Sequence, residues 1–216
     1  MTKIIFCLPG RSFSGNFLSC WTELYHNCLA RGITPILSQQ YSCNIYYART
    51  NCLGADANRG KNQKPFDAKI DYDYIMWIDS DIIFEINQLL KLIEHKKDIC
   101  SGLYLMEGGK NFACVKDWNE EFFQKNGHFQ FLSHDDIKDQ KELMSVNYVG
   151  MGWMLVKKGV FESIEYPWFE PIRKKIGDAI EFTMEDVAFC HKAIECGYKI
   201  YIDPTIIVGH EKTVIL

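Results

Sequence analysis

The 216-residue chain carries a formal net charge of −4, and its 47% hydrophobic and 24% charged residues are typical of a globular protein. This length suits one α/β domain with a full core and is short for two. The acidic balance gives no electrostatic support to a nucleic-acid partner, and charged residues interrupt every apolar run before it reaches the length of a membrane span. We therefore expect neither a nucleic-acid partner nor a membrane span.

The nine cysteines include no Cys-x-x-Cys pair, and most lie inside apolar segments. Their odd number and their neighbours predict reduced, mostly buried thiols in a cytosol-like compartment. The amino terminus is interrupted too early for a signal peptide, so we expect a cytoplasmic protein. A zinc site formed by Cys190, His191 and Cys196 is an open alternative, although this spacing fits no common ligand pattern.

The first third of the chain alternates predicted strands and helices. Residues 3–8 and 34–38 predict strands, and residues 16–29 predict an amphipathic helix between them. A strand, a loop with Gly and Ser, and then a helix is the usual place for phosphate groups, because backbone N–H groups are exposed at the helix start. The loop at 10–15 lacks the glycine spacing of a dinucleotide site or a P-loop, so it identifies no ligand by itself.

A second helix is predicted over residues 42–53, with Arg49 in a position to contact a diphosphate or simply to face solvent. The polar stretch 54–71 predicts a long loop. Arg59, Lys61 and Lys64 cluster in it, and loops of this length are often functional.

The apolar run 74–84 is interrupted by Asp79-Ser80-Asp81. Its first part predicts a strand buried on both faces. Two carboxylates at the tip of such a strand are costly unless their charge is compensated, and Mg²⁺ or Mn²⁺ suits carboxylate oxygens. One of them could instead cap the helix that begins near Glu85, but a cap needs only one carboxylate. The pair therefore favours a divalent-metal site.

Beyond this strand, residues 87–95 predict a helix, 99–104 a strand, and 106–139 a less regular region. Further strands are predicted over 143–148 and 149–156. Gly150 and Gly152 mark a close backbone approach there, and a turn between core strands explains them as well as a binding role does.

The aromatic turn at 166–169 suits either sugar stacking or core packing. An amphipathic helix is predicted to begin at Thr183, with Asp186 completing a variant capping box. The positive helix end is expected to lower the pKa of Asp186 and keep it ionised, as a general base requires, although a capping role alone is the alternative. His210 follows an apolar strand, as Asp79 does, and is a candidate third metal ligand.

The order of these motifs resembles the GT-A glycosyltransferases of the family-2-like type. An apolar strand ends in Asp-x-Asp, Trp153 follows Gly-x-Gly, Glu-Asp heads a helix, and Gly-His follows Asp-Pro. The sequence also resembles the chlorovirus enzymes that glycosylate the major capsid protein, which would place it in the host cytoplasm. The resemblance implies one α/β domain over 1–216 with a mixed, mostly parallel central sheet flanked by helices. About 1–104 would bind the nucleotide sugar, and about 105–216 would hold the acceptor side and the base. Because the sequence ends shortly after His210, it could be the first domain of a longer protein.

The resemblance also implies roles for individual residues. Asp186 would be the catalytic base, while Asp79, Asp81 and His210 would bind Mn²⁺ or Mg²⁺. Arg49-Thr50-Asn51 departs from the Arg-Asn pair expected in the family. The implied nucleotide-sugar contacts are Leu8, Pro9, Gly10, Arg11, Asn44, Arg49, Asp79, Ser80, Gly150, Gly152 and Trp153.

The predicted activity is metal-dependent transfer from a nucleoside-diphosphate sugar, with a UDP-sugar favoured, to a hydroxyl of a glycan or glycoprotein. The base at Asp186 favours inversion. A haloacid-dehalogenase-type phosphatase is an alternative, but its Asp-x-Asp usually lies near the chain start and continues with Thr or Val rather than Ile82. A non-catalytic carbohydrate- or nucleotide-sugar-binding module is another. The presence of Asp81, Asp186 and His210 together argues against it.

Overall fold

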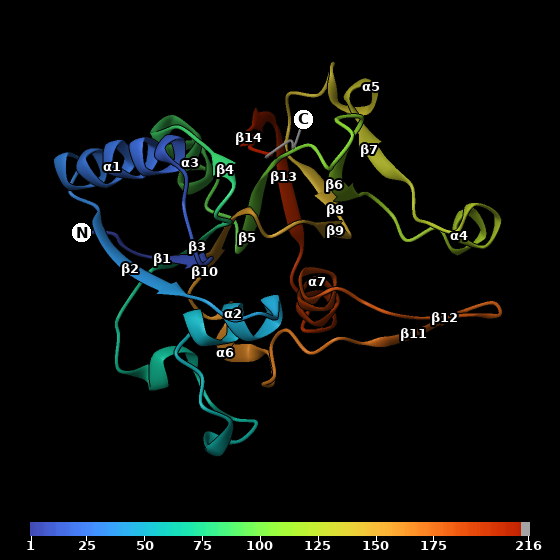
Figure 1. Ribbon diagram of the computed structural model, residues 1–216, viewed down its shortest axis with the longest axis horizontal. Helices are drawn as coiled ribbons and strands as arrows, with labels where there is room; N and C mark the ends of the chain where they lie inside the picture. Colours follow the sequence, from blue (N-terminus) through green and yellow to red (C-terminus); the bar gives the residue numbers. More distant parts are fainter. Residues whose placement is uncertain (213–216) are drawn as a thin grey trace.

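A seven-stranded sheet in the order β2-β1-β3-β10-β5-β13-β8 forms the centre of the computed structural model, which describes residues 1–212 (Figure 1). β2, β1, β3, β5 and β13 run in one direction, and β10 and β8 run in the other. This confirms the predicted mixed, mostly parallel sheet. The strands are β1 (Lys3–Pro9), β2 (Thr34–Gln40), β3 (Tyr74–Ile78), β5 (Ile99–Leu103), β8 (Met144–Val146), β10 (Trp153–Lys157) and β13 (Ile200–Ile207).

The central strands are apolar on both sides because the sheet is covered on both faces. In β1, Ile4 and Phe6 belong to one core and Ile5 and Cys7 to the other. The unbroken apolar runs of the sequence correspond to these doubly buried strands.

Helices α1 (Gly15–Ala30) and α3 (Ile86–Glu94) cover one face of the sheet, and α2 (Ile45–Cys52), α6 (Val160–Ser163) and α7 (Glu185–Glu195) cover the other (Figure 1). α1 begins where the side-chain oxygen of Ser14 accepts a hydrogen bond from the Phe17 N–H at 3.0 Å. None of the helices within residues 1–212 is both long and apolar enough to cross a bilayer.

A second, smaller layer lies beyond the edge of the main sheet, and much of it comes from the region that the sequence left irregular. Its sheet has the order β7-β6-β9, and the hairpin of β11 and β12 extends beside α4 and away from α7 (Figure 1). The elements are β6 (Asn111–Val115), α4 (Glu120–Asn126), β7 (Phe131–Ser133), α5 (His134–Ile137), β9 (Tyr148–Val149), β11 (Arg173–Ile176) and β12 (Ala179–Phe182).

Two very short strands join distant parts of the chain. β4 (Ile82–Ile83) directly follows Asp81 and pairs antiparallel with β14 (Gly209–His210), with His210 opposite Ile82. The backbone N–H of Glu211 donates to the carbonyl of Asp81 at 2.7 Å. This pairing carries His210 to the tip of the central strand.

The structure decides between two interpretations of the aromatic turn at 166–169. Trp168 and Phe169 are 0% and 1% exposed, and the indole N–H of Trp168 donates to the carbonyl of Phe161 at 3.0 Å. The turn is therefore part of the core and does not present a surface for sugar stacking.

The basic loop is also held by local contacts. Arg59 pairs with Asp67, and Lys61 pairs with Glu165 on the surface. All nine cysteines are free thiols.

Candidate active site

Asp81 and His210 meet through the β4–β14 pairing. The Nε2 atom of His210 lies 3.1 Å from Oδ2 of Asp81, and the Nζ atom of Lys212 donates to the same oxygen at 2.8 Å. Burial of Asp81 opposes ionisation, but the hydrogen bonds from His210 and Lys212 outweigh it and lower the pKa of the carboxyl to about 2. Asp81 is therefore an anion throughout the physiological pH range, as a metal ligand must be.

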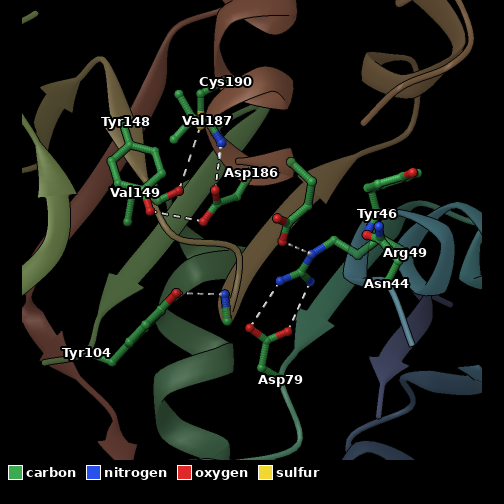
Figure 2. A network of polar contacts seen from close by, with 12 residues as sticks. Asn44, Tyr46, Arg49, Asp79, Tyr104, Tyr148, Val149, Asp186, Val187 and Cys190 are labelled. Carbon is green, nitrogen blue, oxygen red and sulfur yellow. Dashed lines mark hydrogen bonds and ion pairs between the residues drawn. The ribbon is translucent and has the colours of Figure 1, made fainter. Parts of the chain in front are cut away.

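Asp79 has a different partner from Asp81. Its Oδ2 accepts a hydrogen bond from the Nη2 atom of Arg49 at 3.1 Å, and its Oδ1 forms an ion pair with Nη1 at 3.0 Å, as Figure 2 shows. The Nε–H of Arg49 donates to Oε1 of Glu185 at 3.0 Å, and the guanidinium lies 5.5 Å from the Trp77 ring centre. Arg49 is 2% exposed, and its guanidinium lies among Asp79, Glu185 and the Trp77 ring. The solvated-helix interpretation is therefore wrong, and Arg49 links β3 to α7. Its contact with a diphosphate stays a prediction.

Asp186 lies in the first turn of α7 and is partly buried. The Tyr148 hydroxyl donates to its Oδ2 at 3.0 Å, and the Val187 N–H donates to its Oδ1 at 2.7 Å (Figure 2). Burial and then the neighbouring charge of Glu185 raise the pKa of Asp186 to about 6, although Arg49 and the hydrogen bonds act against this shift. The expectation that the helix end would lower this pKa is therefore wrong, because burial beside a second carboxylate outweighs the helix end. At neutral pH the carboxyl is still mainly ionised.

The predicted capping box of α7 is also wrong. The helix begins at Glu185 after the extended residue Met184, so Thr183 is not its cap. The Thr183 hydroxyl instead accepts from the backbone N–H of Ile172 at 2.9 Å. Asp186 therefore forms no capping box with Thr183. The Asp186 carboxylate instead contacts the Tyr148 hydroxyl and the Val187 N–H in its own helical turn.

Gly150 and Gly152 are required by an aromatic ring. A Cβ atom on Gly150 would lie 2.0 Å from the Tyr104 hydroxyl, and one on Gly152 would lie 2.9 Å from the same ring. The Gly152 N–H also donates to this hydroxyl oxygen at 3.3 Å, and the Gly152 carbonyl accepts from the Asp79 N–H at 3.0 Å. Trp153 is 0% exposed and stacks on Phe84. The glycines therefore shape the backbone beside Asp79, and the Trp153 side chain belongs to the core.

The remaining predicted nucleotide residues follow β1 and begin α2. Gly10 packs so closely against Ser80 that an added Cβ would lie 2.7 Å from the Ser80 Cβ, which places the loop after β1 beside Asp79-Ser80-Asp81. Leu8 and Pro9 are buried, while Arg11 is exposed and lies over the Tyr41 ring. Asn44 caps α2 by accepting from the Tyr46 N–H at 3.4 Å. Their contacts with a nucleotide stay a prediction.

The donor atoms of Asp81 and His210 fit a divalent cation. The carbonyl of Leu105 accepts from the His210 Nδ1–H at 2.6 Å, which orients the ring with Nε2 facing Asp81. A cation bound to Asp81 would take the place of the Nε2–H proton and receive the Nε2 lone pair. One carboxylate and one imidazole leave room for phosphate oxygens and water, as Mn²⁺ and Mg²⁺ prefer. In residues 1–212 no three His, Cys, Asp or Glu side chains converge. Thus Asp79 does not join Asp81 and His210 in the structure, and Cys190, His191 and Cys196 form no zinc cluster.

Sequence reasoning missed four residues that complete this site: Tyr104, Tyr148, Glu185 and Lys212. Glu185 directly precedes Asp186, and Lys212 lies two residues after His210. A charged residue close to a predicted site residue was therefore the available signal. Tyr148 and Tyr104 carried none, since each is one aromatic residue in an apolar strand region.

Solved structures with a similar fold include three at low sequence identity. A197 from STIV aligns with a TM-score of 0.55 and 14% identity over 100% of this chain and 97% of its own. GalNAc-T7 with UDP, GalNAc and Mn²⁺ aligns with a TM-score of 0.56 and 11% identity over 99% of this chain and 43% of its own. The catalytic domain of Drosophila β1,4-galactosyltransferase 7 with xylobiose aligns with a TM-score of 0.53 and 12% identity over 99% and 72%.

No protein-family model and no curated protein sequence matches the chain. The structural similarity is therefore the finding that identifies the fold. It covers nearly the whole chain in all three comparisons. The protein has the fold of the GT-A glycosyltransferases, as the order of its sequence motifs predicted.

Proposed function

We propose that this protein transfers a sugar from a nucleoside-diphosphate sugar to a hydroxyl of a glycan or glycoprotein acceptor. One observation carries the proposal. The ion pairs Asp79–Arg49–Glu185 connect the carboxyl end of β3, where Asp81 meets His210, with the first turn of α7, which carries Asp186. A site suited to a divalent cation, formed by Asp81 and His210, and a partly buried base, Asp186, thus lie at one edge of a GT-A sheet. The similar fold of GalNAc-T7, solved with UDP, GalNAc and Mn²⁺, supports a UDP-sugar as the donor.

The donor half of the site consists of Asp81, His210 and the loops that carry Gly10 and Ser80. Asp81 and His210 would hold a Mn²⁺ or Mg²⁺ ion, which as a Lewis acid stabilises the negative charge on the departing nucleoside diphosphate. Arg49 holds the Asp79 carboxylate in a fixed orientation beside these loops. Asp79 would thus face the ribose rather than ligate the metal.

The transfer half of the site is Asp186. Its carboxylate removes the proton from the acceptor hydroxyl, whose oxygen forms a bond to the anomeric carbon of the donor as the bond to the diphosphate breaks. A single displacement of this kind inverts the anomeric configuration. Tyr148 holds Oδ2 of Asp186 through its hydroxyl, and the Val187 N–H holds Oδ1, so the carboxyl group is fixed before substrate arrives.

The pH dependence of turnover is expected to follow Asp186. Since its pKa is raised to about 6, kcat measured at saturating metal and donor should fall by about tenfold per pH unit below this value. The loss does not reflect unfolding. A carboxyl whose folded-state pKa exceeds its unfolded value adds stability as the pH falls from about 6 toward 4. Parallel kcat and thermal-melting profiles check this, and a kcat that is flat from pH 7 to 5 contradicts it.

The experiment that tests the function is a panel of nucleoside-diphosphate sugars incubated with the protein and Mn²⁺, with release of the nucleoside diphosphate as the readout. Release from at least one sugar nucleotide, abolished by a chelator, is the expected result. Phosphate release from a generic phosphoester, without any sugar-nucleotide turnover, would establish the phosphatase alternative. Tight nucleotide-sugar binding without turnover in the presence of diverse acceptors would establish a binding module.

A further inference from the structure

A cavity of about 470 Å³, within the range of ligand pockets, lies beside the first turn of α7. It is lined by residues of β9, α7, the segment around α4 and β7, and the β11–β12 hairpin. Figure 1 shows these elements gathered at one end of the molecule. Aromatic rings dominate its walls: Trp118, Phe129, Phe131, Tyr148, Phe182 and His191. We call it the aromatic pocket.

The aromatic pocket begins at the proposed base. Tyr148 forms part of its wall, and the hydroxyl of the same residue donates to Asp186 at 3.0 Å. Val187, the residue after Asp186, lines it as well. None of Arg49, Asp79, Asp81 and His210 lines it. Met106 lines both this pocket and the cavity beside His210 and Lys212, so the pocket is a neighbour of the donor side. It also adjoins the point at which an acceptor hydroxyl would be deprotonated.

The pocket has rigid, stacked walls. The Trp118 ring stacks on His191 with centres 5.0 Å apart and an interplanar angle of 15°, and it meets Phe129 edge-on at 4.7 Å. Tyr148 stacks on Trp118 at 6.1 Å. These contacts fix the rings with respect to one another, so the cavity exists without reorganisation of its walls.

Both hydroxyl groups in the walls already have partners. The Tyr148 hydroxyl donates to Asp186, and the Thr183 hydroxyl accepts from the Ile172 N–H. Burial lowers the pKa of His191, so this ring is neutral. The charged side chains of the lining are those of Glu120, Lys174, Lys175 and Glu181, and all of these residues except the half-buried Lys174 are exposed. Between the aromatic rings the hydroxyls of a sugar would find few partners, whereas an apolar group needs none.

We propose that the aromatic pocket binds an apolar group, aromatic or branched aliphatic, that the acceptor carries next to the hydroxyl that Asp186 deprotonates. This inference rests on the proposed function and specifies its acceptor: the molecule is amphiphilic, with its nucleophilic hydroxyl at the boundary between Asp186 and the aromatic walls. The group is part of a glycoside aglycone or of a peptide side chain, and the chemistry that recognises it is the same in both.

Binding of small probes tests the inference without a donor. The 19F NMR signal of 4-fluorophenyl β-glucoside reports its binding. Displacement of this probe by methyl β-glucoside, which lacks the aromatic ring, gives the affinity of the methyl glucoside. The aryl glucoside should bind about tenfold or more tightly, because burial of an aromatic ring favours it. In the same competition assay, acetyl-Phe-Ser-amide against acetyl-Gly-Ser-amide tests the peptide source. If neither apolar probe exceeds its partner, the inference is overturned.

Matched variants on one strand locate the binding. Phe182 is 62% exposed and lines the pocket, whereas Ile180 is 55% exposed and lies outside it. Phe182→Ser should weaken binding of the preferred apolar probe several-fold, and Ile180→Ser should leave it unchanged. A second lining variant, Phe129→Ser, should weaken it too, with melting curves to establish that it folds. Equal effects of Phe182→Ser and Ile180→Ser would overturn the assignment.

The outcome is separable from that of the proposed function. Selective binding of the apolar probes without any sugar-nucleotide turnover supports the pocket and contradicts the transferase proposal. Sugar-nucleotide turnover without selective binding supports the transferase and overturns the pocket.

Discussion

Asp186→Asn is expected to lower the rate of sugar transfer by about 10²–10⁴-fold while donor binding persists. The amide has nearly the shape of the carboxylate; its oxygen can still accept from the Val187 N–H, and its NH2 group can donate to the Tyr148 hydroxyl oxygen. It cannot take a proton from an acceptor hydroxyl. Single-turnover rates and nucleotide affinities, measured on the same preparations, separate these two effects.

The stability of the Asp186→Asn variant provides a further check. Burial raises the pKa of Asp186, which means that the ionised carboxylate is unfavourable in the folded state. A neutral amide removes that penalty, so the melting temperature at neutral pH should equal or exceed that of the wild type. Asp135→Asn, at a carboxylate that is 87% exposed, serves as the matched control and should retain full activity. Equal transfer rates in the wild type and Asp186→Asn would remove the base assignment.

Arg49→Met is expected to lower the free energy of unfolding by about 3–5 kcal/mol, because it removes the cation that pairs with the buried Glu185 and the part-buried Asp79. Glu185 is 5% exposed and would lose the cation that compensates it, and Asp79 would lose its hydrogen bond and its ion pair with the guanidinium. Methionine fills a similar length but carries no charge. Denaturant unfolding of the wild type and the variant measures the difference.

Arg59→Met is the control for this variant, since Arg59 pairs with Asp67 at 3.4 Å where the two side chains are 25% and 44% exposed. An ion pair in contact with solvent contributes about 0–1 kcal/mol, so the loss should be small. Equal losses of unfolding free energy in the two variants would contradict a role for the Arg49 ion pairs in holding β3 and α7 together.

The features predicted from the sequence are those that depend on neighbouring residues. The buried central strands, the helix that follows Ser14 and the position of Asp79-Ser80-Asp81 at a strand tip follow from local apolar patterns and a local cap. The resemblance placed His210 with Asp81, and the structure confirms that they meet across 129 residues of sequence.

The features that were missed depend on distant partners. Arg49 is buried because Glu185 reaches it from 136 residues away, and no property of its own helix signals this. Burial of Asp186 and the charge of the same Glu185 raise the pKa of Asp186, whereas the sequence predicted a lowered pKa. The β11–β12 hairpin has one entirely exposed strand, so it lacks the alternation of apolar and polar residues that marks a half-buried strand. The aromatic pocket collects rings from four separate segments.

The central claim is that Asp81 and His210 form a metal-dependent nucleoside-diphosphate site and that Asp186 acts only in transfer. Isothermal titration calorimetry with UDP tests it most directly, because UDP requires no knowledge of the sugar or the acceptor. The wild type and Asp186→Asn should bind UDP with similar affinity in Mn²⁺ and weakly in a chelator, and Asp81→Ala should bind weakly in both. Unchanged UDP affinity in Asp81→Ala, or no Mn²⁺-dependent binding to the wild type, would contradict the account.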